Sequence, residues 1–240
     1  MNLIVDTGNT FTKIALFDKA VMVDFERYKS DSAELKDAIQ RMAAIADHAI
    51  ISSIGKLVDE SFFDGYSFNK LIKFSNKTPL PLKNAYKTPE TLGSDRLAAA
   101  VGGWKHFPGR NILTIDAGTA ITFDFTSADG TYHGGSISPG IRLRYRALNQ
   151  FTERLPMLEP DFDPLLIGTD TKSSIHSGVM LGIAAETEGI INAYNEQYKD
   201  VVIILTGGDY LFFDKQLKIK KFALPNLILE GLEAILEYNK

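Results

Sequence analysis

The chain begins with a pattern of apolar positions that predicts three consecutive strands. Residues 2–5 are mostly apolar and end at Asp6, and a small polar turn, TGNT, follows at residues 7–10. Apolar residues return at positions 13–17 and again at positions 21–28. Short apolar runs that are bounded by polar turns are typical of strands, so the start of the chain is predicted to fold as three of them.

A helical spacing then replaces the strand pattern. Leu35, Ile39 and Met42 recur three to four positions apart. This spacing predicts an amphipathic helix over residues 33–46. Alternation of strands and helices is typical of an α/β fold, and it continues along the chain. A strand, a short helix and another strand are predicted at residues 48–52, 57–63 and 71–74.

The strand-and-turn unit at the start of the chain occurs a second time. LIVDTGNTFT at residues 3–12 aligns with LTIDAGTAIT at residues 113–122, so that Asp116 matches Asp6 at a separation of 110 residues. Two similar units half a chain apart indicate a duplicated domain pair. The predicted domains are two α/β lobes, at residues 1–110 and 111–240.

The remaining elements complete the second lobe. GGSISPG is predicted to be a glycine-rich loop, and TGGD follows an apolar strand, at the end where α/β sheets bind their ligands. A helix at residues 97–106 precedes the domain boundary. The other predicted elements are helices at residues 141–151, 179–198 and 224–238 and a strand at residues 201–205.

Composition changes this picture only by exclusion. The 240 residues carry a net charge of −4, which argues against sequence-independent binding to nucleic acid or anionic lipid. Cysteine is absent, so a disulfide framework, a thiol nucleophile and a thiolate metal site are excluded. No run approaches the ~18 apolar residues of a membrane span. We expect a soluble, cytoplasmic protein without nucleic-acid or membrane partners.

The first acidic turn has the residue types of a phosphate and metal site. Asp6 can face a hard cation or its water, and Lys13 adds a positive charge. Gly8 lets backbone come close to a ligand. A polar hairpin turn has a similar sequence, and the second copy at Asp116 favours the ligand site. The other donors for phosphate oxygens are the amides and hydroxyls of Thr7, Asn9, Thr10 and Thr12.

A second candidate site lies where the polar stretch TPETLGSDR opens a helix. Asp95 and Ser94 are both candidates for the N-cap of that helix. The alternative is that Asp95 is a general base, because a carboxylate can accept the proton of an alcohol that attacks phosphorus. Arg96 could bind a carboxylate or phosphate, and Gly93 leaves room for a substrate.

Taken together, these motifs resemble those of the type III pantothenate kinases, a family of the acetate and sugar kinase, Hsc70 and actin superfamily. They follow the family's order over nearly the whole chain. The motifs are DTGNT at residues 6–10 with Lys13, Tyr86 ahead of TPETLGSDR, IDAGTA at 115–120, GGSISPG at 134–140, T-x-x-S-I-x-S-G at 171–178 and TGGD at 206–209.

The resemblance implies a fold and an activity. The fold would be two duplicated ribonuclease-H-like lobes, with mixed sheets flanked by helices and a cleft between the lobes. The activity would be ATP-dependent phosphorylation of pantothenate to 4′-phosphopantothenate, the first step of coenzyme A biosynthesis. The implied cofactors are Mg²⁺ or a similar divalent ion and a monovalent K⁺ or NH₄⁺ ion, and the implied assembly is a homodimer.

The resemblance also implies roles for individual residues. Asp95 would be the catalytic base, and Asp116 would bind the monovalent cation. The residues implied to contact pantothenate are Tyr86, Gly93, Ser94, Asp95, Arg96 and Thr171, the last across the dimer interface. Those implied to contact ATP are Asp6, Thr7, Gly8, Asn9, Thr10, Phe11, Thr12, Lys13 and Thr119.

Two other functions stay open from the sequence. One is another small-molecule kinase of the same superfamily that acts on a different acceptor. The other is a non-catalytic regulator that keeps a nucleotide-binding cleft. The presence of Asp6, Asp95 and Asp116 together argues against a regulator, because a protein without catalysis need not keep a base beside the phosphate turn.

Some polar residues have simpler interpretations. Ser52 and Ser53 begin a small polar turn that could face the cleft, but they are interpreted as part of a plain loop between a strand and a helix. Arg142 and Arg146 lie four positions apart and share a helix face; they could touch an anion, but this face is interpreted as solvated or subunit-facing. The sequence by itself favours Thr171 as a helix-capping residue.

Overall fold

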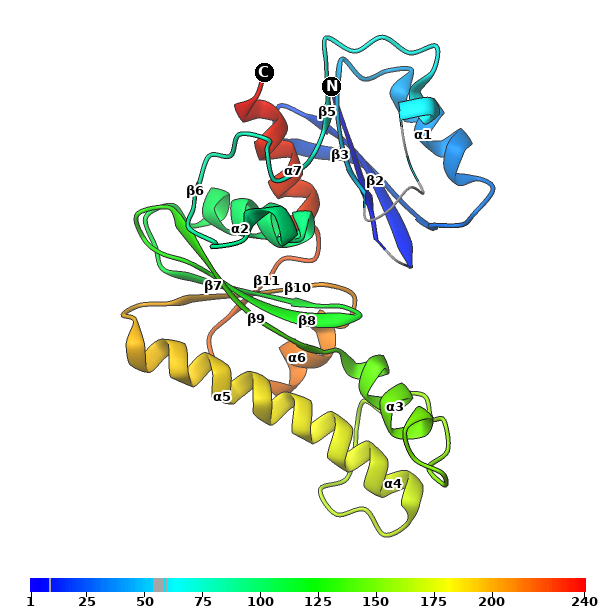
Figure 1. Cartoon of the computed structure of the whole chain (residues 1–240), viewed down its shortest axis with the longest axis vertical. Helices are drawn as coiled ribbons and strands as arrows, with labels where there is room; N and C mark the ends of the chain where they lie inside the picture. The colour runs from blue at the N-terminus through cyan, green and yellow to red at the C-terminus, as the bar shows by residue number, and fades with distance from the viewer. Residues whose placement is uncertain (9, 54–57, 59) are drawn as a thin grey trace. The chain divides into compact units, whose positions relative to one another are not determined.

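The computed structural model describes the chain except for residues 9, 54–57 and 59. The chain divides into two compact units (Figure 1). The first unit comprises Met1–His106 and Asn226–Lys240, and the second comprises Phe107–Pro225. The domain prediction assigned the last residues of the chain to the second lobe, whereas in the structure they belong to the first unit.

The first unit is built on a mixed sheet with strand order β3-β2-β1-β4-β5. The first three strands in the chain pair antiparallel, and the next two run parallel to β1. The strand bounds are β1 (Asn2–Thr7), β2 (Phe11–Asp18), β3 (Val21–Lys29), β4 (His48–Ser53) and β5 (Lys70–Lys73).

The second unit repeats this arrangement. Its strands follow the order β11-β10-β7-β8-β9, with β7, β8 and β9 antiparallel and β10 and β11 parallel to β7. Each strand thus has a counterpart in the first unit with the same place and direction. The predicted fold class, duplicated α/β lobes with mixed sheets and flanking helices, is confirmed. The bounds are β7 (Ile112–Ala117), β8 (Ala120–Thr126), β9 (Thr131–Pro139), β10 (Val202–Thr206) and β11 (Phe222–Ala223).

Helices cover the sheet of the first unit. The helix α1 (Leu35–Ala43) packs its apolar face on buried residues of β1, β2 and β4. The helices α2 (Ser94–His106) and α7 (Leu227–Tyr238) pack closely on one another, because an added Cβ at Gly231 would lie 1.8 Å from Ala98 O. Since α7 also packs on β1 and β4, the carboxy-terminal helix is part of the first unit's core.

Short elements connect these parts of the first unit. They are η1 (Glu60–Phe63), β6 (Lys83–Asn84) and η2 (Pro89–Thr91). The prolines between β5 and α2 agree with the irregular connection that this stretch forms. No helix among the residues that the structure describes is both long and apolar enough to cross a membrane.

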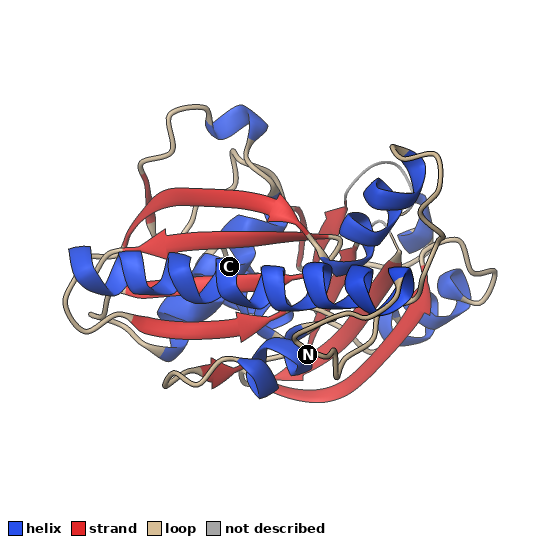
Figure 2. Ribbon diagram, turned by 90° about the horizontal axis from the view of Figure 1, so that it is seen from below, coloured by secondary structure: helices blue, strands red, loops and turns tan. Residues whose placement is uncertain are grey.

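The second unit places its long helix across one face of its sheet, as Figure 2 shows from below. Ile183 and Ile191 of this helix pack in one core with residues such as Leu113 and Phe123. The helix is longer than predicted, since helical structure is continuous from Thr171 onward. The elements are α3 (Ile141–Gln150), α4 (Thr171–His176), η3 (Ser177–Leu181), α5 (Gly182–Gln197) and α6 (Tyr210–Gln216).

The glycine-rich loop predicted at residues 134–140 is wrong, because most of that stretch belongs to the edge of the sheet as β9. An added Cβ at Gly135 would lie 1.6 Å from Phe123 O, so glycine is needed for the backbones to approach. Gly134 has φ +92° next to a register shift in the β8–β9 pair. The glycines therefore serve strand pairing and a bulge.

Candidate active site

The first acidic turn lies at the carboxyl end of β1, the central strand of the first unit's sheet. In the strand register Asp6 is opposite Lys13 on β2 and opposite Ser52 on β4. Side chains at paired positions of neighbouring strands point to the same face, so these three lie next to one another. The carboxylate therefore has a cation on one side and a hydroxyl donor on the other.

Asp6 is in a strongly perturbed electrostatic environment. Burial is the largest cause that raises the pKa of Asp6, to about 6 from its ordinary value of 3.8. The positive charge of Lys13 lowers this pKa, the negative charge of Asp95 raises it, and a hydrogen bond from Ser52 lowers it. The structure thus brings Asp6, Lys13 and Asp95 into one cluster within the first unit. Carboxylates perturbed by burial and by specific charged neighbours are candidates for functional groups.

The backbone of the turn that follows Asp6 is held in a fixed shape. Gly8 N donates to Phe11 O at 3.0 Å, and Ser30 Oγ donates to Gly8 O at 2.9 Å. The Thr7 hydroxyl is buried and has no hydrogen-bond partner among the described residues. A buried hydroxyl without a partner is costly, so this position fits a group that gains its bond from a ligand.

The other residues predicted to contact phosphate lie along the same turn. The buried hydroxyl of Thr12 donates to Ser30 Oγ at 3.1 Å, so this side chain supports the turn from within. Thr10 and Phe11 are exposed. Asn9 lies outside the described residues.

The candidate base lies at the start of α2. Ser94 is the first residue of this helix, and Asp95 lies in its first turn, where Asp95 Oδ1 accepts a hydrogen bond from Arg96 N at 2.8 Å. An added Cβ at Gly93 would lie 2.4 Å from Asp95 Oδ1, so a side chain at this position would clash with the carboxylate and glycine avoids the clash. This bond from the next amide is not the bond from the second or third amide that an N-cap side chain accepts, and the charge of Asp95 also acts on Asp6. The role of Asp95 as a base stays a prediction.

Tyr86 and Arg96 lie against one another near this turn. The guanidinium carbon of Arg96 is 5.6 Å from the ring centroid of Tyr86, and the Arg96 side chain is buried. A guanidinium above an aromatic face is held in orientation by the ring's electrostatic attraction. The pair thus combines an anion-binding group with a flat apolar surface.

Ser52 links the two parts of this cluster. Its hydroxyl oxygen lies 3.3 Å from Ser94 Oγ, and its side chain also hydrogen-bonds Asp6. Ser52, which the sequence placed both at the end of the strand at residues 48–52 and in the turn that follows, lies buried within β4. The available signal was a small polar residue at the carboxyl end of a predicted strand, but its register with Asp6 could not be read from the sequence.

The second acidic turn is held mainly by backbone. Gly118 N donates to Ala120 O at 3.0 Å, and Asp209 N donates to Ala117 O at 2.9 Å. The amide of Gly140, the N-cap residue of α3, donates to Thr119 O at 3.0 Å. The sequence predicts that Asp116 binds the cation and that Thr119 contacts ATP. Both residues belong to one turn, which backbone hydrogen bonds hold in place.

The TGGD stretch lies directly against this turn. Gly207 has φ +91°, and an added Cβ there would be 2.3 Å from Asp116 Oδ1. Asp209 also accepts a hydrogen bond from Arg142 Nη1 at 3.0 Å. The interpretation of Arg142 as merely solvated or subunit-facing is therefore incomplete, because this side chain connects α3 to the TGGD stretch.

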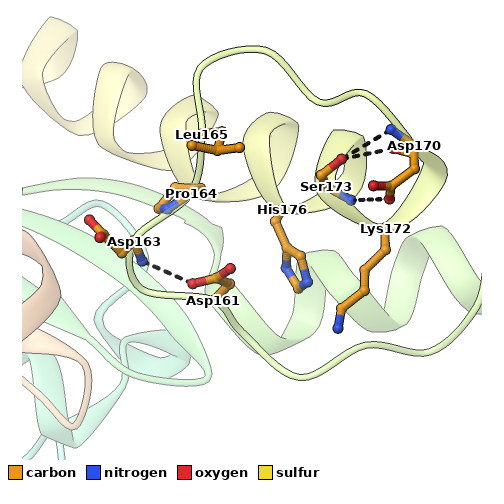
Figure 3. Close-up of a pocket in the computed structure, with 8 residues that line it drawn as sticks. All are labelled: Asp161, Asp163, Pro164, Leu165, Asp170, Lys172, Ser173 and His176. Carbon is orange, nitrogen blue, oxygen red and sulfur yellow. Dashed lines mark hydrogen bonds between the residues drawn. The ribbon is translucent and has the colours of Figure 1, made fainter.

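Thr171 lies on a separate element of the second unit. It is exposed and is the first residue of α4, whose N-cap is Asp170 in a capping box with Ser173. The capping role that the sequence favoured for Thr171 therefore belongs to Asp170. Figure 3 shows the small cavity beside this cap, into which His176 points. Its volume of about 160 Å³ is below the roughly 300 Å³ of typical small-molecule pockets.

The strand order and acidic turns of the two units define a class of proteins, the acetate and sugar kinase, Hsc70 and actin superfamily. A glucokinase of the ROK family from Streptomyces griseus, solved with glucose and AMPPNP, aligns over 99% of each chain with TM-score 0.53 and 12% identity. A conserved Campylobacter jejuni protein, named as a Baf family transcriptional activator, aligns over 99% of this chain and 98% of its own, with TM-score 0.63 and 20% identity. These similarities show the fold alone.

Sequence comparison identifies the family. The family model described as type III pantothenate kinase matches residues 2–193. A type III pantothenate kinase from Phocaeicola vulgatus is 42% identical over 241 residues, covering 100% of this chain and 99% of its own. The chain belongs to the type III pantothenate kinase family. It is therefore a kinase enzyme with the function of that family.

Proposed function

We propose that this chain transfers the γ-phosphoryl group of ATP to the primary hydroxyl of pantothenate and releases 4′-phosphopantothenate, the first step of coenzyme A biosynthesis. The observation that supports the site assignment is the cluster of Asp6, Lys13, Ser94 and Asp95 in the first unit. It combines a phosphate turn with a carboxylate at a helix start. Use of ATP fits a cytoplasmic location.

The phosphates of ATP are assigned to the turn from Asp6 to Lys13, with Thr119 in the second unit as a further contact. The buried hydroxyl of Thr7 supports this assignment, because it has no partner among the described residues and a phosphate oxygen would supply one. The side chain of Lys13 supplies positive charge next to Asp6. The contacts of Asn9 remain a prediction from the sequence.

A divalent ion such as Mg²⁺ could be held by Asp6 together with waters and the phosphates of ATP. Among the described residues there is no group of three or more His, Asp or Glu side chains that could hold a metal ion. Mg²⁺ commonly keeps several waters and binds through one or two carboxylates and substrate phosphates. Asp6 would hold such an ion, directly or through water. When bound, the ion neutralises charge on the phosphates.

The monovalent cation is assigned to Asp116. The backbone of Gly207 lies so near Asp116 Oδ1 that a Cβ would fill the space beside the carboxylate. Carboxylate and carbonyl oxygens are suitable ligands for a hard cation. Asp116 would hold K⁺ or NH₄⁺, and the bound ion adds positive charge near the nucleotide.

The acceptor is assigned to the surface formed by Tyr86 and residues 93–96. Arg96 would bind the carboxylate of pantothenate, since a guanidinium forms paired hydrogen bonds with a carboxylate. The ring of Tyr86 offers an apolar face and holds the guanidinium. Gly93 and Ser94 would line the path of the acceptor hydroxyl to Asp95.

Asp95 acts as the general base in this proposal. Its carboxylate accepts the proton as the pantothenate hydroxyl attacks the γ-phosphorus in line with the leaving oxygen of ADP. Positioning and charge stabilisation supply most of the rate enhancement in phosphoryl transfer, so the held geometry of Asp95 matters as much as its basicity.

Thr171 is assigned to pantothenate binding across a homodimer interface. The same region of the second unit carries large exposed apolar side chains, including Leu165, Leu166 and Ile167, which are 67%, 79% and 74% exposed. A contiguous exposed apolar stretch is typical of an interaction site. This exposure supports the homodimer as part of the proposal.

Replacement of Asp95 by Asn tests the assignment. It keeps the shape of the side chain and removes its basicity, so phosphopantothenate formation with ATP, Mg²⁺ and K⁺ should fall by roughly a hundredfold or more. Nucleotide affinity, measured by titration calorimetry, should remain close to that of the unaltered protein. Equal turnover would make Asp95 only a capping residue.

A panel of acceptors separates the remaining alternatives. Pantothenate should be phosphorylated, whereas hexoses and acetate should give no product under the same conditions. Product with a different acceptor and none with pantothenate would assign the chain to another reaction of the superfamily. Nucleotide binding without any product would favour a regulator.

A further inference from the structure

Ser52 occupies a position that joins the acidic turn to the base. It is 1% exposed and lies at the carboxyl end of β4. The parallel pairing of β1 with β4 puts it level with Asp6. Because side chains alternate along a strand, Ser52 faces the same side of the sheet as Asp6, and Ser53 faces the opposite side.

The hydrogen bonds of Ser52 have a single consistent direction. When Asp6 is ionised its carboxylate accepts and does not donate, so the hydroxyl of Ser52, which is paired with Asp6 in the strand register, is the donor to it. The Ser52 oxygen can then only accept, and its neighbour at 3.3 Å, Ser94 Oγ, must be the donor. The chain of donation runs from Ser94 to Ser52 to Asp6.

The far end of this chain sets the start of α2. Ser94 is the first residue of the helix, and Asp95 follows it directly. A helix moves as a rigid element, so a bond that fixes Ser94 also fixes where the carboxylate of Asp95 lies. Ser52 is a direct side-chain link between β4 and the start of α2, in addition to the packing of α7 on α2, β1 and β4.

We propose that Ser52 is a positioning residue of the phosphoryl transfer, which holds the phosphate turn and the helix of the base at a fixed separation. The inference rests on the roles assigned above to Asp6 and Asp95. A consequence concerns Ser94, whose proton is committed to Ser52. Toward the substrate, the Ser94 oxygen acts only as an acceptor, so it can receive a hydrogen bond from a hydroxyl or amide but cannot donate to a carbonyl.

Replacement of Ser52 by Ala removes the link with little change in volume. We expect kcat to fall by about 10–100-fold, because a displacement of about 1 Å from the reacting geometry can reduce a rate by that order. The KM for ATP should change little, because the phosphate turn keeps its own backbone bonds. The matched control is Ser53→Ala, which removes a hydroxyl from the same strand end but from the opposite face.

A second set of variants separates positioning from folding. Thermal unfolding of Ser52→Ala should remain cooperative, and Ser52→Thr should recover part of kcat because it restores a hydroxyl. If the extra methyl prevents folding of Ser52→Thr, the double variant S52A/S94A serves instead. Its loss of kcat should be smaller than the product of the two single losses, since each substitution breaks the same link.

The outcomes distinguish this inference from the site assignment. An inactive Asp95→Asn with kcat of Ser52→Ala equal to that of Ser53→Ala would overturn the role of Ser52 and leave the base assigned. Independent, multiplicative effects of S52A and S94A would overturn it as well. An active Asp95→Asn would overturn the assignment of the base, whatever the serine variants show.

Discussion

The two acidic turns are built on the same strand frame but differ in what surrounds the carboxylate. In the first unit Asp6 pairs across the hairpin with Lys13, whereas in the second unit Asp116 pairs with Thr122. The second turn is one residue shorter, so the partner of its carboxylate is a neutral hydroxyl instead of a cation. Duplication therefore kept the strands and changed the charge.

This difference suggests a division of labour. Around Asp6 the determining feature is electrostatic, because burial, Lys13 and Asp95 all act on its pKa. Around Asp116 it is the close packing of backbone, with Gly207 against the carboxylate and backbone bonds to the turn from both sides. A turn surrounded by charged groups, like the first, fits the proposed binding of phosphates, whose charge changes during transfer. A turn with closely packed backbone, like the second, fits the proposed binding of a cation of fixed size.

Parallel substitution of the two carboxylates should break the comparison most clearly. Asp6→Asn should lower kcat/KM for ATP by roughly a hundredfold at every K⁺ concentration, because it removes a charge at the phosphate turn. Asp116→Asn should instead weaken or remove the proposed activation by K⁺. The measurement is initial rate against K⁺ and ATP for both variants.

The same kinetics contain the contradicting result. If Asp116→Asn keeps the K⁺ response of the unaltered enzyme, the cation does not depend on this carboxylate. If both variants lose activity in the same way and with the same K⁺ dependence, the two turns do not have separate roles.

Substitution of the glycines after β10 should sharpen the description of the second turn. Gly207→Ala should destabilise the protein by about 1–3 kcal/mol, because φ +91° is strained for alanine and its Cβ would lie 2.3 Å from Asp116 Oδ1. Gly208→Ala is the matched control, since an added Cβ there meets nothing within 4 Å. Thermal unfolding of both variants gives the comparison, and equal destabilisation would show that the contact with Asp116 does not matter.

Local pattern and duplication were enough to predict most strands and the fold class from the sequence. The match between residues 3–12 and 113–122 survives in the structure as β1 with β7, but it misaligns the residues after the turn. The sequence alignment matches Thr122 with Thr12. In the structure Thr122 lies opposite Asp116, and the residue that lies opposite Asp6 is Lys13, so Thr122 corresponds to Lys13. A one-residue deletion in a turn leaves matching residue types in the sequence alignment but changes which side chains lie opposite one another in the strands.

Long-range packing could not be predicted from the sequence. The close approach of α7 to α2 depends on Gly231 against Ala98, which are more than a hundred residues apart. The roles of Ser52 and Arg142 depend likewise on partners that only the fold brings near. In the candidate site, the residue types and their order were predictable, and the hydrogen bonds that orient them were not.

The perturbed carboxylate of Asp6 should also be visible in stability. Burial raises its pKa to about 6, so between 3.8 and 6 the native state keeps a proton that the unfolded state releases, and stability from this group falls as pH rises. Above this range the native state buries a charge. Asp6→Asn should therefore raise the melting temperature by a few degrees at pH 8 and have almost no effect at pH 4. In a chain of this size, each kcal/mol of stability shifts the melting temperature by about 2–4 °C.

The difference between the two melting curves is the quantity to measure, because the ionising groups that do not interact with Asp6, unlike Lys13 and Asp95, contribute equally to both proteins. A variant that is less stable than the unaltered protein at pH 8 would contradict a net cost of ionising Asp6.

Loss of the ion pair between Arg142 and Asp209 should have the smallest effect. Arg142 is 57% exposed, and exposed pairs contribute about 0–1 kcal/mol, so Arg142→Gln should lower stability by no more than that and less at high salt. Arg146→Gln is the matched control, because it removes the same charge one helical turn further along α3. The KM for ATP should rise slightly in the first variant only, if the pair holds the TGGD stretch against the second turn. If the two variants behave identically in unfolding and in KM, the ion pair does not hold the TGGD stretch. Backbone hydrogen bonds and the packing of Gly207 would then hold it, which would strengthen the contrast between a second turn held by backbone and a first turn surrounded by charge.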